Sequence, residues 1–195
     1  MPGTESTRRG AILLRLARAS LDDELRGAAS TGPADEARHY EPWLLEPGAT
    51  FVTLRRGDEL RGCVGSVEIV RPLIEDVRRN AVAAALRDPR FPPLELVELV
   101  EVELEVTLLS SPEPISFTSE TDALAQLRPG EDGLLLQWQR HRATYLPQVW
   151  ESLRDPEAFL ASLKRKAGLA PDFWHPELDL RRYTAEHWSE SELPG

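Results

Sequence analysis

The sequence predicts an α+β fold in which antiparallel-rich sheets are flanked by helices. Two β-rich runs, 49–54 and 60–67, are joined by a short turn that contains Gly57, as in a hairpin. Residues 100–108 alternate between apolar and acidic or polar side chains, which is typical of a strand with one buried face. Helical patterns lie between such strands without strict β-α alternation, and this favours α+β over a parallel α/β sheet.

The composition indicates an ordered globular protein. The chain has 195 residues, of which 41% are hydrophobic and 29% charged, and this length predicts a single domain over 1–195. One cysteine cannot form an intramolecular disulfide, and no cleavable apolar leader or membrane-spanning run is visible. We therefore expect a cytoplasmic protein without a membrane segment.

The first half of the chain contains two predicted helices. Helical spacing of apolar residues predicts the first over 8–26, with Thr7 as a cap and Gly27 as a stop. Residues 28–48 lack a period and are expected to form a long connector. Pro72 opens the second helix, which we expect to end at about residue 87.

The second half predicts shorter elements and a terminal strand. The expected elements are a helix at 121–127, a hairpin of strands 134–138 and 143–146, helices at 147–153 and 156–167, and a strand at 181–188. Gly168 is expected to close the last helix, and residues 189–195 to fray.

The segment LRGCVG, residues 60–65, is the first candidate functional site. Glycine is unfavourable inside a strand, so Gly62 and Gly65 indicate a bulge, unusual dihedral angles or the close approach of a ligand or of another backbone. Cys63 between them is a candidate nucleophile if neighbouring cations stabilise its thiolate, and Arg61 shares its face only if no bulge intervenes. The alternative is that Cys63 is a small core residue and the glycines permit tight packing.

Four ordered blocks resemble the AMMECR domain family, which includes the AmmeMemoRadiSam system protein A group. They are LRGCVG, NAVAAALRDPRFPPL at 80–94, ATYLPQVW at 143–150 and LKRKAGL at 163–169. The resemblance covers most of the chain. It implies an α+β fold with a larger and a smaller lobe, and a pathway shared with a Memo-like protein and a radical SAM protein. It implies no established reaction.

The family pattern falls on residues in all four blocks. The matching residues are Arg61, Gly62, Cys63, Gly65, Asp88, Arg90, Phe91, Pro92, Leu146, Pro147, Lys166 and Gly168. From this set we take Cys63 and Lys166 as candidate catalytic residues. The candidate binding residues are Arg61, Gly62, Gly65, Asp88 and Arg90, to which we add Tyr145 from the third block.

Each of the remaining candidates also has a structural interpretation. Lys166 is one of two lysines in a chain with 21 arginines, but a cation in a last helical turn is also favoured by the helix dipole. Asp88 and Arg90 could hold an anion or could simply brace a loop after a helix. Tyr145 could offer a phenol to a cleft or could pack within a strand.

The sequence predicts neither a metal site nor a cofactor site. The four histidines show no metal-binding spacing, one cysteine cannot build a thiolate zinc or iron–sulfur site, and no phosphate-binding glycine motif is present. The acidic residues within 95–105 are interpreted as the wet face of a strand. A net charge of −10 opposes direct nucleic-acid binding.

Two hypotheses of function therefore remain open. In the first, the chain is an enzyme or enzyme component in which Cys63 is a nucleophile or covalent carrier, and Arg61, Arg90 and Lys166 bind a small anionic ligand or a modified macromolecule. In the second, the same blocks maintain the fold of a non-catalytic adaptor that binds another protein.

Overall fold

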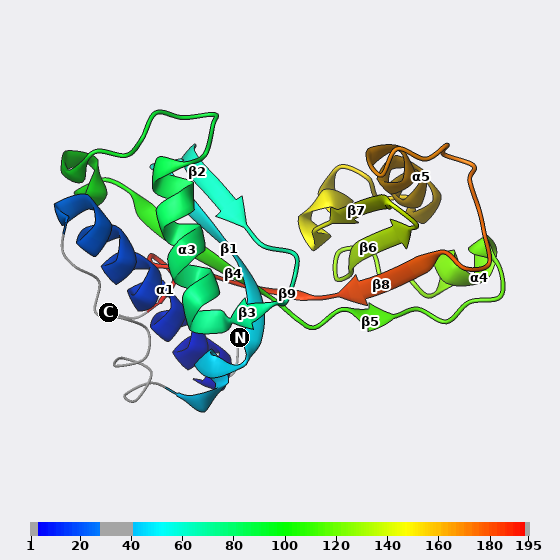
Figure 1. The fold of residues 1–195 in the computed structure, drawn as a ribbon, viewed down its shortest axis with the longest axis horizontal. Helices are drawn as coiled ribbons and strands as arrows, with labels where there is room; N and C mark the ends of the chain where they lie inside the picture. The colour runs from blue at the N-terminus through cyan, green and yellow to red at the C-terminus, as the bar shows by residue number, and fades with distance from the viewer. Residues whose placement is uncertain (1–3, 28–40, 194–195) are drawn as a thin grey trace. The chain divides into compact units, whose positions relative to one another are not determined.

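The computed structural model describes residues 4–27 and 41–193, and it confirms the α+β fold. Contacts divide the chain into two compact units (Figure 1). The first consists of residues 1–109 and 186–195, and the second of residues 110–185. Each unit has its own sheet and is described by itself. The prediction of one domain over 1–195 stays a prediction.

The first unit is built on a sheet with strand order β2-β1-β4-β9, to which β3 adds by pairing with β1. The strands are β1 (Pro47–Arg56), β2 (Glu59–Gly65), β3 (Arg71–Pro72), β4 (Glu103–Leu109) and β9 (Ala185–Ser189). The predicted hairpin is present, since β1 pairs antiparallel with β2. Because β2 ends the strand order, one of its edges has no neighbouring strand among the residues that the structure describes.

Helices α1 (Thr4–Arg26) and α3 (Leu73–Leu86) lie beside each other against one face of this sheet (Figure 1). Both helices follow the predicted apolar period, and Gly27 ends α1 with a φ of 66°. Alternate residues of the strands bury their side chains against the helices, among them Val52, Leu54, Leu104 and Val106. This helix-covered face holds the core of the unit.

A fully buried carboxylate fastens α3 to the sheet. Asp76 accepts hydrogen bonds from the backbone N–H and the hydroxyl of Thr50, at 2.7 and 2.8 Å, and from Ser66 at 2.7 Å. Asn80, one turn later, donates to Asp76 and to the carbonyl of Thr50 at 2.9 Å. Asp76 also pairs with Arg71 of β3 at 3.3 Å, so the buried charge has hydrogen-bond partners and a cation, as a buried charge requires.

Both glycines of β2 permit close packing. A Cβ on Gly62 would lie 2.1 Å from the carbonyl oxygen of Ala84 in α3, and one on Gly65 would lie 2.2 Å from the ring of Phe51. The register shifts between Leu54, which pairs with Gly62, and Arg55, which pairs with Leu60. Arg61 is therefore the extra residue of a β-bulge, one of the possibilities that the glycines indicated.

The second unit has a sheet of order β5-β8-β6-β7. Its strands are β5 (Glu113–Pro114), β6 (Gly133–Trp138), β7 (His141–Tyr145) and β8 (Asp179–Tyr183), and its helices are α4 (Glu120–Ala125) and α5 (Pro156–Lys166). The predicted hairpin of 134–146 is the pair β6–β7. Its core includes Leu134 and Leu136 of β6 and Phe159, Leu160 and Leu163 of α5.

Several predicted boundaries are wrong. The terminal strand expected at 181–188 is two strands, β8 in one sheet and β9 in the other, separated at Thr184. The strand expected from residue 100 begins at Glu103, because residues 96–100 form the 3-10 helix η3 (Leu96–Val100). The helix expected at 147–153 is the 3-10 helix η4 (Pro147–Glu151). Local pattern identified these segments but not their sheet membership or helix type.

The connector predicted over 28–48 is only partly visible. Residues 28–40 lie outside the described residues, whereas Pro42–Leu45 form the 3-10 helix η2 and β1 already begins at Pro47. The Arg9 guanidinium lies 4.7 Å from the ring centroid of Trp43 and so links η2 to α1. Among residues 4–27 and 41–193, no helix has the length and apolarity to cross a membrane.

Replacing Gly62 with alanine is expected to destabilise the first unit. The new methyl group would meet backbone rather than a movable side chain, so α3 and β2 must separate. We expect a loss of about 2 to 3 kcal/mol in the free energy of unfolding, measured by urea denaturation. The exposed strand residue Glu59, replaced with alanine, is the control. A G62A variant as stable as E59A would contradict this packing.

Candidate functional site

The thiol of Cys63 lies on the sheet face that α1 and α3 leave uncovered. Thr50, Val52 and Leu54 of β1 face the helices, so the alternate residue Thr53 faces the other way. Cys63 pairs directly with Thr53 across β1 and β2. Cys63 therefore does not pack in the core between the sheet and the two helices, because its side chain points away from that core.

Cys63 is half-buried and has one side-chain partner. The Thr53 hydroxyl donates to Cys63 Sγ at 3.2 Å. This contact is typical of directly opposed residues whose backbone groups point outward, since such pairs bring their side chains close. The thiol therefore has a fixed direction without being enclosed.

The backbone of Cys63 is held by the two side chains predicted around Pro89. Asp88 Oδ2 accepts the N–H of Cys63 at 2.9 Å, and Arg90 Nη2 donates to the Cys63 carbonyl at 3.3 Å. These are the groups that a neighbouring strand would otherwise satisfy. Asp88 and Arg90 thus cover the free edge of β2 at the cysteine itself.

Asp88 and Arg90 also form a bidentate ion pair. Arg90 donates from Nε to Oδ1 at 2.9 Å and from Nη2 to Oδ2 at 2.6 Å, and its backbone N–H donates to Oδ1 at 3.1 Å. The bond from Arg90 is the main cause that holds the pKa of Asp88 well below its ordinary value, while burial opposes it. The same bond raises the pKa of Arg90. Both groups stay charged at neutral pH.

The side chain of Arg61, the bulged residue, is engaged by the segment that follows Arg90. It donates to Glu98 from Nε at 3.0 Å and from Nη2 at 2.9 Å, and from Nη1 to the carbonyl of Pro92 at 3.0 Å. The bond from Arg61 lowers the pKa of Glu98. Its side chain is only 11% exposed. This geometry makes Arg61 a clamp that ties β2 to η3.

Tyr145 and Lys166 lie together in the second unit. The Lys166 ammonium donates to the carbonyl of Thr144 at 2.9 Å and lies 4.8 Å from the ring centroid of Tyr145. The Tyr145 hydroxyl bonds to Ser162 of α5 at 2.9 Å, and its ring packs edge-on against Phe159. Tyr145 thus holds β7 to α5, and Lys166 is exposed in the last turn of that helix.

The other lysine is the more unusual one. Lys164 is fully buried, and its ammonium contacts Glu120 Oε1 at 2.6 Å and lies 5.5 Å from the ring centroid of Trp174. Glu120 opens α4, so this ion pair joins α4 to α5. Lys166 was selected from the sequence because the family pattern falls on it, whereas Lys164 is the lysine that the fold buries.

Two further partners were not identified from the sequence. Thr53 belongs to an ordinary β-rich run, and only the pairing register places its hydroxyl on the thiol. Glu98 belongs to the acidic run that was interpreted as the face of a strand, although it lies in η3 and binds Arg61. Within the described ranges, no group of three or more His, Cys, Asp and Glu side chains could hold a metal ion.

Replacing Asp88 with asparagine is expected to destabilise the first unit by about 2 kcal/mol at neutral pH, since charge-assisted bonds to Arg90 and Cys63 are weakened. The folded-state pKa of Asp88 is lowered from 3.8, so the carboxylate stabilises the fold above about pH 4. That stabilisation is lost as the pH falls below this value towards the folded-state pKa. The difference between wild type and D88N should therefore shrink in acid.

Urea denaturation between about pH 7 and pH 2.5 measures this difference. The exposed Asp58, replaced with asparagine, is the control and should change stability by less than about 0.5 kcal/mol. A difference between wild type and D88N that grows on acidification would show that the sign is wrong.

The Glu120–Lys164 pair is expected to respond asymmetrically to substitution. Glu120→Ala leaves a fully buried ammonium without its carboxylate, at a cost of about 3 kcal/mol. Lys164→Met leaves Glu120, which is 35% exposed, free to hydrate, so we expect a loss below about 1 kcal/mol. Urea unfolding of both variants, with the exposed Glu177→Ala as control, measures this. Equal losses would contradict the asymmetry.

Known proteins are similar to the chain over nearly its whole length. A relative from Thermofilum pendens is 37% identical over 209 residues, covering 99% of this chain and 95% of its own. A relative from Methanothermobacter thermautotrophicus is 37% identical and covers 93% of this chain and 94% of its own. Protein MJ0810 of Methanocaldococcus jannaschii is 36% identical and covers 95% and 92%. None of these names states an activity.

A solved structure and a family model agree with these similarities. The crystal structure of the uncharacterised protein PH0010 from Pyrococcus horikoshii is similar with a TM-score of 0.77 and 35% identity, covering 95% of this chain and 92% of that one. The family model described as AMMECR1 matches residues 14–188, a range that contains all four blocks of the predicted resemblance. The chain belongs to the AMMECR1 family.

Proposed function

We propose that this protein is an enzyme, or a component of one, that uses the Cys63 thiolate as a nucleophile or covalent carrier on an anionic small molecule or modified macromolecule. One observation carries the proposal. The structural contributions of LRGCVG come from residues other than the cysteine side chain, whereas the thiol points from the sheet face opposite α1 and α3.

The packing contributions of the other residues are specific. The absence of a side chain at Gly62 allows the close approach of α3, and at Gly65 it allows the close approach of the Phe51 ring. Arg61 binds Glu98. The backbone of Cys63, not its side chain, receives Asp88 and Arg90. A purely structural role would be met by another small side chain at position 63. The thiol is therefore the feature of the segment that packing explains least.

Charge around the thiol favours an anionic ligand. In the Asp88–Arg90 pair the Asp88 side chain is 3% exposed and the Arg90 side chain 55% exposed, so a ligand arriving from solvent meets the cation first. The Thr53 hydroxyl donates to the sulfur, and the Arg90 guanidinium donates to the carbonyl of the same residue. Arg90 is the proposed anion anchor, and Thr53 directs the sulfur.

The remaining candidates have different positions in this proposal. Arg61 is assigned to the fold because Glu98 and two carbonyls engage its guanidinium. Lys166 and Tyr145 belong to the second unit, where an exposed ammonium beside a phenol ring could anchor an anion independently. The proposal assigns no reaction to them.

Family resemblance supplies the proposed context. We expect the chain to work in the cytoplasm in a pathway with a Memo-like protein and a radical SAM protein. Any cluster chemistry would belong to the radical SAM partner, since this chain has one cysteine and a cysteine-ligated cluster needs more. Direct nucleic-acid binding is not part of the proposal, because a net charge of −10 opposes it.

An adaptor is the second candidate function, favoured by a separate observation. Three apolar side chains of η3 are exposed: Leu96 by 41%, Val97 by 71% and Val100 by 90%. Arg61 fixes this 3-10 helix to β2, so the apolar side chains are presented from a rigid support. In this reading, the family blocks hold a protein-binding surface in place.

Alkylation of the single cysteine tests the proposal. Iodoacetate and iodoacetamide differ mainly in charge, so the ratio of their rates cancels the general reactivity of the thiol. Arg90→Gln is expected to lower the iodoacetate-to-iodoacetamide ratio of the native protein about threefold, since the attraction between two nearby unit charges in water is roughly 1 kcal/mol or less. Arg90→Lys should largely keep the ratio, because it retains a cation.

Mass spectrometry measures both rates, and circular dichroism checks that each variant is folded. Arg79→Gln, which removes an exposed arginine of α3, is the matched control and should leave the ratio unchanged. The denatured chain gives the intrinsic ratio. A native Cys63 that resists both reagents, or a ratio that is the same in R90Q and R79Q, would contradict the proposal and favour the adaptor.

A further inference from the structure

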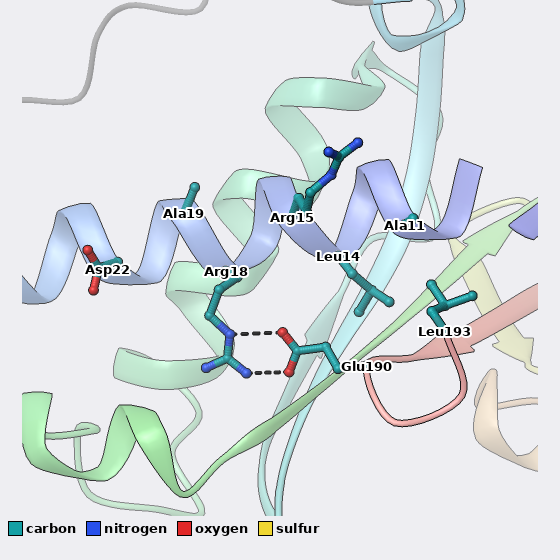
Figure 2. A pocket seen from close by; sticks show the side chains of 8 residues that line it. All are labelled: Ala11, Leu14, Arg15, Arg18, Ala19, Asp22, Glu190 and Leu193. Atoms are coloured by element: carbon teal, nitrogen blue, oxygen red, sulfur yellow. Dashed lines mark hydrogen bonds and ion pairs between the residues drawn. The ribbon is translucent and has the colours of Figure 1, made fainter. Parts of the chain in front are cut away.

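A cavity of about 670 Å³ lies along α1 in the first unit, and Cys63 is not among its lining residues. Most of its lining comes from one stripe of the helix, and the rest from the segment after β9 (Figure 2). The lining residues are Ala11, Leu14, Arg15, Arg18, Ala19, Asp22, Glu190 and Leu193. The volume is within the range of small-molecule sites, roughly 300 to 1,000 Å³.

One wall of the cavity is polar, and its polar groups already have hydrogen-bond partners within the protein. Arg18 and Glu190 form a two-pronged ion pair, drawn with dashed lines in Figure 2. Arg18 also donates to the carbonyls of Leu99 at 2.9 Å and Val102 at 2.8 Å, and Glu190 accepts the backbone N–H of Leu104 at 2.9 Å. These groups satisfy one another, so their surface can face an apolar ligand without leaving a charge unpaired.

The rest of the lining is apolar at one end and acidic at the other. Leu14 and Leu193 lie near Ala11 at one end of the stripe (Figure 2). Asp22 lies at the other end, where it pairs with Arg26 at 2.8 Å. The stripe from Ala11 to Asp22 is about 16 Å long, from a rise of about 1.5 Å per residue. Its Ala11 end, where the two leucines lie (Figure 2), offers an apolar chain the most contact.

Arg15 supplies the charge available to a ligand. Its side chain is exposed and points to the opposite side of the stripe from the Arg18–Glu190 pair (Figure 2). In the part of the chain that the structure describes, its guanidinium has no ion pair or hydrogen bond. A planar guanidinium matches the two oxygens of a carboxylate.

From this arrangement we infer that the cavity binds an amphipathic carboxylate, whose apolar chain lies against Leu14 and Leu193 and whose head group binds Arg15. At the far end Asp22 is already paired with Arg26, so Arg15 is the cation that is offered to the head group. The net charge of −10 opposes anions in general, so binding depends on the local cation. The inference does not rest on the proposed function of Cys63.

Calorimetric titration of the full chain with sodium decanoate tests this inference. Arg15→Gln is expected to weaken decanoate binding about tenfold, the size of one charge-assisted hydrogen bond. Ala19→Trp places a large ring on an exposed position of the cavity and is expected to weaken it at least about tenfold. Decyltrimethylammonium, with the same chain and the opposite charge, should bind much more weakly than decanoate.

Two control variants separate the cavity from general surface effects. Arg79→Gln removes an exposed arginine of α3, and Glu24→Trp adds a ring to an exposed position of α1 outside the lining; neither should change decanoate binding. Equal affinity of A19W and wild type for decanoate, or equal binding of the decyl cation, would overturn the inference. A change in oligomeric state of A19W without loss of decanoate binding would also overturn it and would assign the cavity to a second copy of the chain.

Discussion

The close approach of α3 to β2 is the constraint on which the first unit depends. Gly62 has no side chain, and so the Ala84 carbonyl oxygen can lie 2.1 Å from the position that a Cβ would occupy. This approach brings the end of α3 to the free edge of β2. Asp88, two residues beyond that end, then reaches the backbone of Cys63 at 2.9 Å and holds Arg90. The lack of a side chain at Gly62 therefore determines the position of α3, and through it the position of Asp88 and Arg90 at the edge of β2.

The same region shows how a sheet edge can be closed by side chains. A carboxylate and a guanidinium take the places of a carbonyl and an N–H on the missing neighbouring strand, at the one residue of β2 that carries a thiol. Because Asp88 and Arg90 satisfy each other as well, the edge is covered without leaving an unpaired buried charge. The pair therefore serves the fold whether or not Arg90 also meets a ligand.

Sequence periodicity predicted most elements because it reports which faces are buried. It placed both long helices, both hairpins and the α+β class, and Gly27 and Gly168 ended helices with positive φ as expected. It could not divide 181–188 between two sheets, since alternation continues through both strands and only long-range pairing separates them at Thr184. It also could not place Glu98 against Arg61, which depends on η3.

In the candidate site, the residues that make the family motif recognisable differ from the residue that could carry chemistry. Most of LRGCVG is explained by packing: Gly62 and Gly65 by contacts closer than a side chain allows, and Arg61 by its clamp on Glu98. Such steric requirements are strict, so they alone can make a segment recognisable without any reaction. A chemical role is therefore to be sought in the group that packing does not require. In this segment that group is the Cys63 thiol, directed by Thr53 on the sheet face opposite α1 and α3.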